Sequence, residues 1–174
     1  MNKENNYSDN VGFAELFIEK VHAGQTDKAG KPYFLHPKRV EEHLFDVINP
    51  NKRLRSLCLN DYTAYWFAAV ALLHDTVEDT WVTEDLLRKL FDDNIANSVM
   101  ILTRRDGESY DDFIERIASS GDTIAIVVKI ADLNDNMNLG RLDDVTEKDI
   151  ERTKKYARAK NRLMCALEEI ALPF

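Results

Sequence analysis

The 174-residue sequence contains only two cysteines, four prolines and six glycines. Cys58 and Cys165 lie far apart and outside any CxxC motif, so the sequence predicts neither a disulfide framework nor a cysteine-ligated zinc site. There is no repeat and no Pro- or Gly-rich linker. We therefore expect a single domain at residues 11–174, preceded by a flexible polar tail at residues 1–10.

Long apolar runs and net positive charge are also missing. The longest apolar run, residues 66–73, is far shorter than the ~20 residues that span a bilayer, and the polar N-terminus does not resemble a signal peptide. We therefore expect a cytoplasmic protein without a membrane span. The formal net charge of −8 excludes general nucleic-acid binding, which needs a positive field. A small anionic ligand is compatible, because a metal ion and a few Lys or Arg residues can make one cleft positive.

Hydrophobic periodicity predicts an all-α single domain without a significant sheet. Pro37 suits a first helical turn and makes His36 a natural N-cap, while Thr83 and Asp93 are expected to cap later helices. The β-branched run at residues 124–130 could form a strand by itself, but no partner strand is evident, so we interpret it as helix. Helices are expected at residues 11–22, from 37 to a point before Pro50, at 61–73, from 84 onward, from 93 through 102, and at 110–118, 122–137 and 147–170.

Chemistry-bearing residues concentrate in three short segments, residues 22–37, 72–80 and 129–136. In the second segment, a strongly apolar helix ends in two aspartates, a histidine and a glutamate, which would be costly to bury without partners. Helical spacing would set His74 over Glu78. The alternative is an ordinary helix end whose acids are solvated.

Two further residues strengthen a metal interpretation. Asp132 ends another apolar stretch, and His36 supplies a second imidazole at a helix start. Imidazole and carboxylate ligands suit Mn²⁺, Fe²⁺, Zn²⁺ or Ni²⁺ better than Ca²⁺. Asp132 could instead pair with Lys129, one turn earlier, and His36 could be a simple cap. We interpret the other two histidines, at positions 22 and 43, as structural.

The strings GKPYFLHP, HDTVEDT and KIADLNDN occur in this order, and together they resemble the hydrolase domain of the RelA/SpoT family of bacterial alarmone enzymes, especially its small stand-alone members. The resemblance runs from about residue 22 to residue 136 and is weaker beyond. It implies an HD-domain helical bundle and a divalent metal, with manganese expected. It assigns metal ligation to His36, His74, Asp75 and Asp132.

The same resemblance implies an activity, the release of pyrophosphate from the 3′ position of guanosine tetraphosphate (ppGpp). It gives Glu78 and Asp79 a role in activating water or transferring protons. The implied substrate-binding residues are Lys28, Asn136, Arg152 and Tyr156.

Three positions depart from the family pattern. Asp27, Leu133 and Asp135 stand where basic, basic and aromatic or histidine side chains are common. These departures keep a second interpretation open, a phosphohydrolase of another nucleotide or of a phosphorylated cofactor such as NADPH. A third, a non-catalytic nucleotide sensor, is disfavoured by Glu78 and Asp79, the two extra acids that follow His74 and Asp75.

If the loop lines the site, replacing Asp27 by Arg should lower the KM for ppGpp. An apolar outer helix face could support a homodimer.

Overall fold

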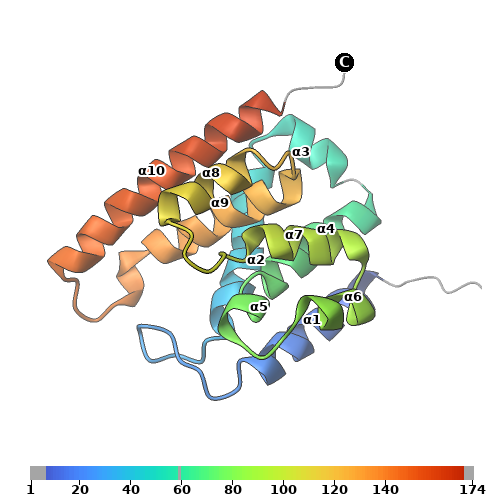
Figure 1. Ribbon diagram of the computed structural model, residues 1–174, viewed down its shortest axis with the longest axis horizontal. Coiled ribbons are helices and arrows are strands. Elements are labelled where there is room, and N and C mark those ends of the chain that lie inside the picture. The colour runs from blue at the N-terminus through green and yellow to red at the C-terminus, as the bar shows by residue number, and fades with distance from the viewer. Residues whose placement is uncertain (1–6, 59, 171–174) are drawn as a thin grey trace, which may run out of the picture.

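The computed structural model describes residues 7–58 and 60–170, and helices make up almost all of their regular structure (Figure 1). Within these residues, the only extended pairing is an isolated antiparallel bridge between Thr26 and Pro32. The predicted all-α fold is thus confirmed. The helices are α1 (Tyr7–Val21), α2 (Leu35–Ile48), α3 (Lys52–Leu57), α4 (Asp61–Leu73), α5 (Thr76–Asp79), α6 (Glu84–Leu90), α7 (Asp93–Leu102), α8 (Tyr110–Ala118), α9 (Thr123–Met137), the 3₁₀ helix η1 (Leu139–Arg141) and α10 (Glu147–Glu169).

Helix α4 lies at the centre of the domain because it is apolar on nearly every side. A helix of this kind must be covered all round, and α4 packs against α1, α2, α7 and α9. Its residues from Phe67 to Leu73 are all buried. The apolar helix expected at residues 61–73 is therefore present and buried, and its C-terminal end leads from the core to His74 and Asp75.

The β-branched run at residues 124–130 is helical and belongs to α9. The side chain of Asp122 caps this helix by accepting from the Ala125 backbone N–H at 2.9 Å. Burial against α2, α4 and α10 stabilises the helix despite the low helical propensity of Ile and Val. Figure 1 shows α10 running along α8 and α9.

The start of α2 differs from the prediction. The N-cap is Phe34, which makes no side-chain cap bond, and His36 lies inside the first turn. The backbone satisfies the first amides instead, since His36 N–H donates to the Tyr33 carbonyl at 2.8 Å. His36 is therefore not a cap, and its imidazole is free to serve the site.

The N-terminal ends of helices α1 and α7 also differ from the predicted positions. Helix α1 begins at Tyr7, inside the segment expected to be a tail, because residues 7–10 contain neither Pro nor Gly to stop a helix. Asp92 rather than Asp93 caps α7, accepting from the Asn94 backbone N–H at 2.8 Å. Residues 1–6 of the expected tail and 171–174 of the expected domain lie outside the described residues.

The loop between α1 and α2 and the segment after α9 lie at the same end of the molecule, at the lower left of Figure 1. They meet beside the C-terminal part of α9, which packs on α2. In the part of the chain that the structure describes, no helix is both long and apolar enough to cross a membrane.

Candidate active site

Two histidines and two aspartates from α2, the end of α4 and α9 converge on one point. His36 Nε2 lies 3.2 Å from Asp132 Oδ1 and 3.5 Å from Asp75 Oδ2. His74 Nε2 lies 3.1 Å from Asp75 Oδ2 and 3.8 Å from Asp132 Oδ1. Ligand atoms of His36, His74 and Asp75 all fall within 4.8 Å of one another. The fold thus brings together all four residues that the sequence proposed as metal ligands.

The orientation of the imidazoles fits a divalent cation. His74 Nδ1 lies 2.8 Å from the Ala71 carbonyl oxygen, which can only accept. Nδ1 therefore carries the proton and donates a hydrogen bond to this oxygen. His74 Nε2 is buried and has no hydrogen-bond partner among the described residues. A buried nitrogen lone pair that faces two carboxylates is the arrangement a cation such as Mn²⁺ or Zn²⁺ would complete.

The charges of the four proposed metal ligands influence one another strongly. Burial would lower the pKa of His74, but the negative charge of Asp75, together with the nearby carboxylate of Asp132, raises it to about 9. In the opposite direction, burial would raise the pKa of Asp75, but the neighbouring charge of His74 and the hydrogen bond of His36 hold it well below its usual range. The imidazoles and carboxylates thus shift one another's pKa in opposite directions, and a bound cation would compete with protons for the imidazole nitrogens.

His74 and Asp75 lie at a break between helices α4 and α5. Helix α4 ends at Leu73, His74 is its C-cap and Asp75 is the N-cap of the short helix α5. The Thr76 hydroxyl stabilises the break by donating to the Leu73 carbonyl at 2.7 Å. The continuous helix assumed in setting His74 over Glu78 is therefore wrong, and the two acids of α5 lie in separate environments.

Tyr33, a residue that the sequence analysis missed, links Asp79 to Asp75 in the cluster of proposed metal ligands. The Tyr33 hydroxyl lies 2.6 Å from Asp75 Oδ2 and 3.0 Å from Asp79 Oδ2, so it can donate to either carboxylate. Burial and the charge of Asp75 raise the pKa of Tyr33, which keeps the phenol protonated. Burial and the same charge also raise the pKa of Asp79.

Glu78 lies elsewhere. Its side chain is exposed and does not line the cavity described below, and Oε2 accepts from the Arg104 backbone N–H at 3.0 Å. It faces a separate groove formed by residues 104–109. A role for Glu78 in activating water therefore stays a prediction.

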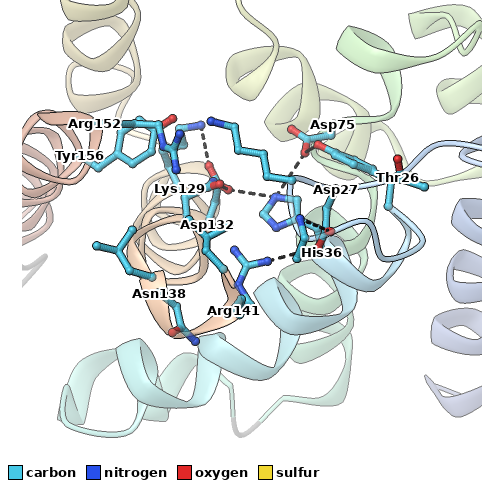
Figure 2. A pocket seen from close by; sticks show the side chains of 16 residues that line it. Thr26, Asp27, His36, Asp75, Lys129, Asp132, Asn138, Arg141, Arg152 and Tyr156 are labelled. Carbon is cyan, nitrogen blue, oxygen red and sulfur yellow. Dashed lines mark hydrogen bonds and ion pairs between the residues drawn. The ribbon is translucent and has the colours of Figure 1, made fainter. Parts of the chain in front are cut away.

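A cavity of about 320 Å³ opens over the ligand cluster (Figure 2). Its wall includes all four residues that the sequence analysis proposed for substrate binding, Lys28, Asn136, Arg152 and Tyr156. Asn136 donates from Nδ2 to Asp132, one of the proposed metal ligands, and Arg152 pairs with Asp149 at 2.8 Å. Lys28 has no ion-pair partner among the described residues, so its charge is available to a ligand.

Two cations of the cavity wall, Lys129 and Arg141, were not predicted as substrate residues. Lys129 Nζ lies 2.7 Å from Asp132 Oδ2, and a dashed line marks this ion pair in Figure 2. The spacing of Lys129 and Asp132 suggested an ion pair as an alternative to metal ligation by Asp132. The structure is compatible with both, because the ion pair uses Oδ2 of Asp132 while Oδ1 faces the two imidazoles. Arg141 lies in η1, which the sequence analysis did not predict.

Asp27 lines the cavity, but its carboxylate is already occupied. Oδ1 accepts from the backbone N–H groups of Ala29 and Lys31 at 2.9 and 3.0 Å, which closes the loop. Oδ2 lies 3.4 Å from both Arg39 and Arg141, and Figure 2 shows the Arg141 contact. The unfavourable acid seen in the sequence is thus paired with two arginines.

This geometry changes the expected result of substitution at Asp27. Arginine would add a third cation between Arg39 and Arg141 and would open the loop, so asparagine is the better test. Asp27→Asn keeps an oxygen for the loop amides and frees positive charge at the cavity wall. We expect a lower KM for a multiply charged nucleotide, and a smaller effect at high salt, because exposed charge is screened over ~10 Å at 0.1 M. Steady-state kinetics at two salt concentrations measures both, and an unchanged KM at low salt would exclude Asp27 from substrate selection.

No family model matches the sequence. Among characterised proteins, the chain is 31% identical over 174 residues to a GTP pyrophosphokinase of Myxococcus xanthus, covering 89% of this chain and 21% of that protein. It is 30% identical over 139 residues to the bifunctional (p)ppGpp synthase/hydrolase SpoT of Escherichia coli, covering 74% of this chain and 18% of SpoT. The guanosine-3′,5′-bis(diphosphate) 3′-pyrophosphohydrolase of Aquifex aeolicus is 27% identical, with 75% and 18% covered. The chain therefore spans about one fifth of the length of these relatives.

A solved structure supports the fold. It is described as a metazoan ortholog of SpoT that hydrolyses ppGpp, and it aligns with a TM-score of 0.68 and 23% identity over 92% of this chain and 93% of that one. A similarity that covers nearly all of both chains confirms the helical architecture. Together with the sequence relatives, it shows that this chain belongs to the RelA/SpoT family and has the helical fold of its hydrolase domain.

Proposed function

We propose that the chain is a metal-dependent ppGpp 3′-pyrophosphohydrolase. Water would attack at the 3′ diphosphate, the bond to the ribose 3′ oxygen would break, and GDP and pyrophosphate would leave. The observation that carries the proposal is the cluster of two histidines and two aspartates, of which His36, Asp75 and Asp132 line a cavity whose wall contains lysine and arginine side chains.

The ligand set proposed for the divalent cation is His36, His74, Asp75 and Asp132. When bound, such a cation supplies Lewis acidity toward a phosphoryl oxygen and toward water. Manganese is the proposed metal, because the family resemblance implies it, and the same donors also suit iron, zinc and nickel.

The chain's own residues would bind and orient the nucleotide. Lys28 and Arg152 would neutralise phosphate charge as it develops, and Asn136 would contact the ribose or a phosphate. The Tyr156 ring, in the same wall, would limit the position of the substrate. Asp79 would take up a proton, since it lies next to the cluster through Tyr33.

A substrate panel tests this proposal. Purified, manganese-loaded protein is incubated with ppGpp, with NADPH and with GDP, and products are separated by ion-exchange chromatography. We expect GDP and pyrophosphate from ppGpp and much slower turnover of the others. Preferred turnover of NADPH would replace ppGpp as the substrate, and binding of ppGpp without turnover would indicate a sensor. The cytoplasmic location and the homodimer stay predictions, which cell fractionation and light scattering of the full chain would test.

A further inference from the structure

The carboxylate of Asp135 is fully buried directly behind the ligand cluster. Its Oδ2 lies 2.7 Å from Nδ1 of His36, the ring nitrogen that faces away from the other ligands. Its Oδ1 accepts from Arg39 Nε at 2.8 Å. Asp135 is one helical turn from Asp132 on α9, so one helix supplies both a ligand and the group behind another ligand.

This contact determines which nitrogen of His36 can bind a cation. When Nδ1 carries the proton and donates it to Asp135, Nε2 keeps its lone pair and points at Asp75 and Asp132. His74 is oriented in the same way, but by the neutral carbonyl of Ala71. The two imidazoles thus have different supports, and only His36 has a charged one.

Two arginines compensate the buried charge of Asp135. Arg39 Nη2 and Arg141 Nη2 lie 3.2 and 3.3 Å from Oδ2, and Arg141 also donates to the Asp135 carbonyl at 2.8 Å. Burial would raise the pKa of Asp135, but hydrogen bonds from His36 and Arg39 lower it to about 2. On the outer side, Asp27 Oδ2 contacts both arginines, and His43 Nε2 lies 3.9 Å from Asp135 Oδ1.

Asp27, Arg39, Asp135 and Arg141 therefore form a network of two acids and two cations, called the Asp135 network below. A buried acid without such partners would be costly. The network joins three segments that are distant in sequence: the loop before α2, α2 itself and the end of α9 with η1. Because Lys28 directly follows Asp27, the same arginines also hold the loop that carries Lys28 at the cavity wall.

We propose that Asp135 is a positioning residue for His36, whose carboxylate holds the Nδ1 proton and aims Nε2 at the metal. The proposal rests on the metal site of the proposed function. It accounts for an acid at a position where the sequence alone suggested a loss of substrate specificity. Arg39 and Arg141 hold the carboxylate in place.

Metal affinity tests this role without using activity. The Kd for Zn²⁺ is measured by competition with a chromophoric chelator, for the wild-type chain and for Asp135→Asn and Asp135→Ala. Loss of a partner behind a metal-bound histidine typically weakens binding about 10–100-fold, so we expect that loss for Asp135→Ala. Asp135→Asn should fall between the two, because its side-chain oxygen can still accept a hydrogen bond from the Nδ1–H group while its NH₂ group faces the arginine donors.

A spectroscopic readout separates positioning from general stability. In the zinc-loaded wild-type protein, two-dimensional ¹H–¹⁵N NMR should detect a proton on His36 Nδ1, protected from exchange by Asp135. The signal should be lost or shifted in Asp135→Ala. Asp122→Ala is the matched control, because it removes an aspartate from the opposite end of α9, where the side chain caps the helix and binds Ser98. It should lower the melting temperature without changing metal affinity.

The outcomes are distinguishable. If the wild-type chain fails to bind Zn²⁺ or Mn²⁺, the metal site and the proposed function both fail, and this inference fails with them. If the wild type binds and both Asp135 variants bind equally tightly, only the role of Asp135 is overturned. If Asp135→Ala does not fold, Asp135→Asn decides, since it preserves the volume of the side chain.

Discussion

Replacing His74 or Asp132 by alanine should abolish both metal retention and phosphohydrolase turnover. Each residue would supply one of only four protein ligands, and the two lie on different helices, so neither loss can be made up locally. In His74→Ala the two carboxylates would face a single imidazole. In Asp132→Ala, Lys129 would lose the carboxylate that pairs with it and would add a buried positive charge next to the site.

Elemental analysis of the purified variants measures the metal, and product release from ppGpp measures turnover. Asp122→Ala provides the control on α9, since a cap is lost at the far end of the same helix. It should cost about 1 kcal/mol of stability but keep the metal. Normal metal content in His74→Ala or Asp132→Ala would contradict the ligand assignment.

Replacing Glu78 by glutamine should leave the fold and the metal intact while lowering turnover about 10²–10⁴-fold, the usual range for loss of a general base. Glutamine has nearly the same shape, and its side-chain oxygen can still accept from the Arg104 backbone N–H. Only the basic oxygen is removed. Turnover is compared at saturating substrate, with metal content and melting temperature measured on the same preparations.

The structure supplies a competing residue for this role, because Asp79 contacts Tyr33 next to Asp75 while Glu78 faces the groove of residues 104–109. Asp79→Asn is therefore measured in parallel. A wild-type rate for Glu78→Gln combined with a large loss for Asp79→Asn would make Glu78 an anchor of that groove. It would also transfer the proton-handling role to Asp79.

The helices and the ligand candidates were readable from local patterns. A helix repeats its environment every three or four residues, so apolar periodicity revealed most helices of the domain, including the β-branched run of α9. Polar residues that end such a helix stand out because burying them needs compensation. His74, Asp75 and Asp132 were identified in this way. The short helices α3 and α5 were not, because four to six residues carry too little periodicity.

The surroundings of the ligands depended on which segments meet, and no local pattern encodes that. Asp27 and Asp135 looked like acids that would repel an anionic substrate, yet the fold brings Arg39 and Arg141 between them, and the charges compensate.

The sequence by itself determined that the domain is helical, because helical periodicity is a local property. Residue types at helix ends, together with the resemblance of three short strings to a known family, indicated which four residues are the candidate metal ligands. Only the tertiary structure decided that Tyr33 links Asp75 to Asp79, that Glu78 faces a different groove, and that a buried acid lies behind His36. Each of these depends on contacts between residues more than 20 positions apart, and their geometry is set by packing of the helices around α4.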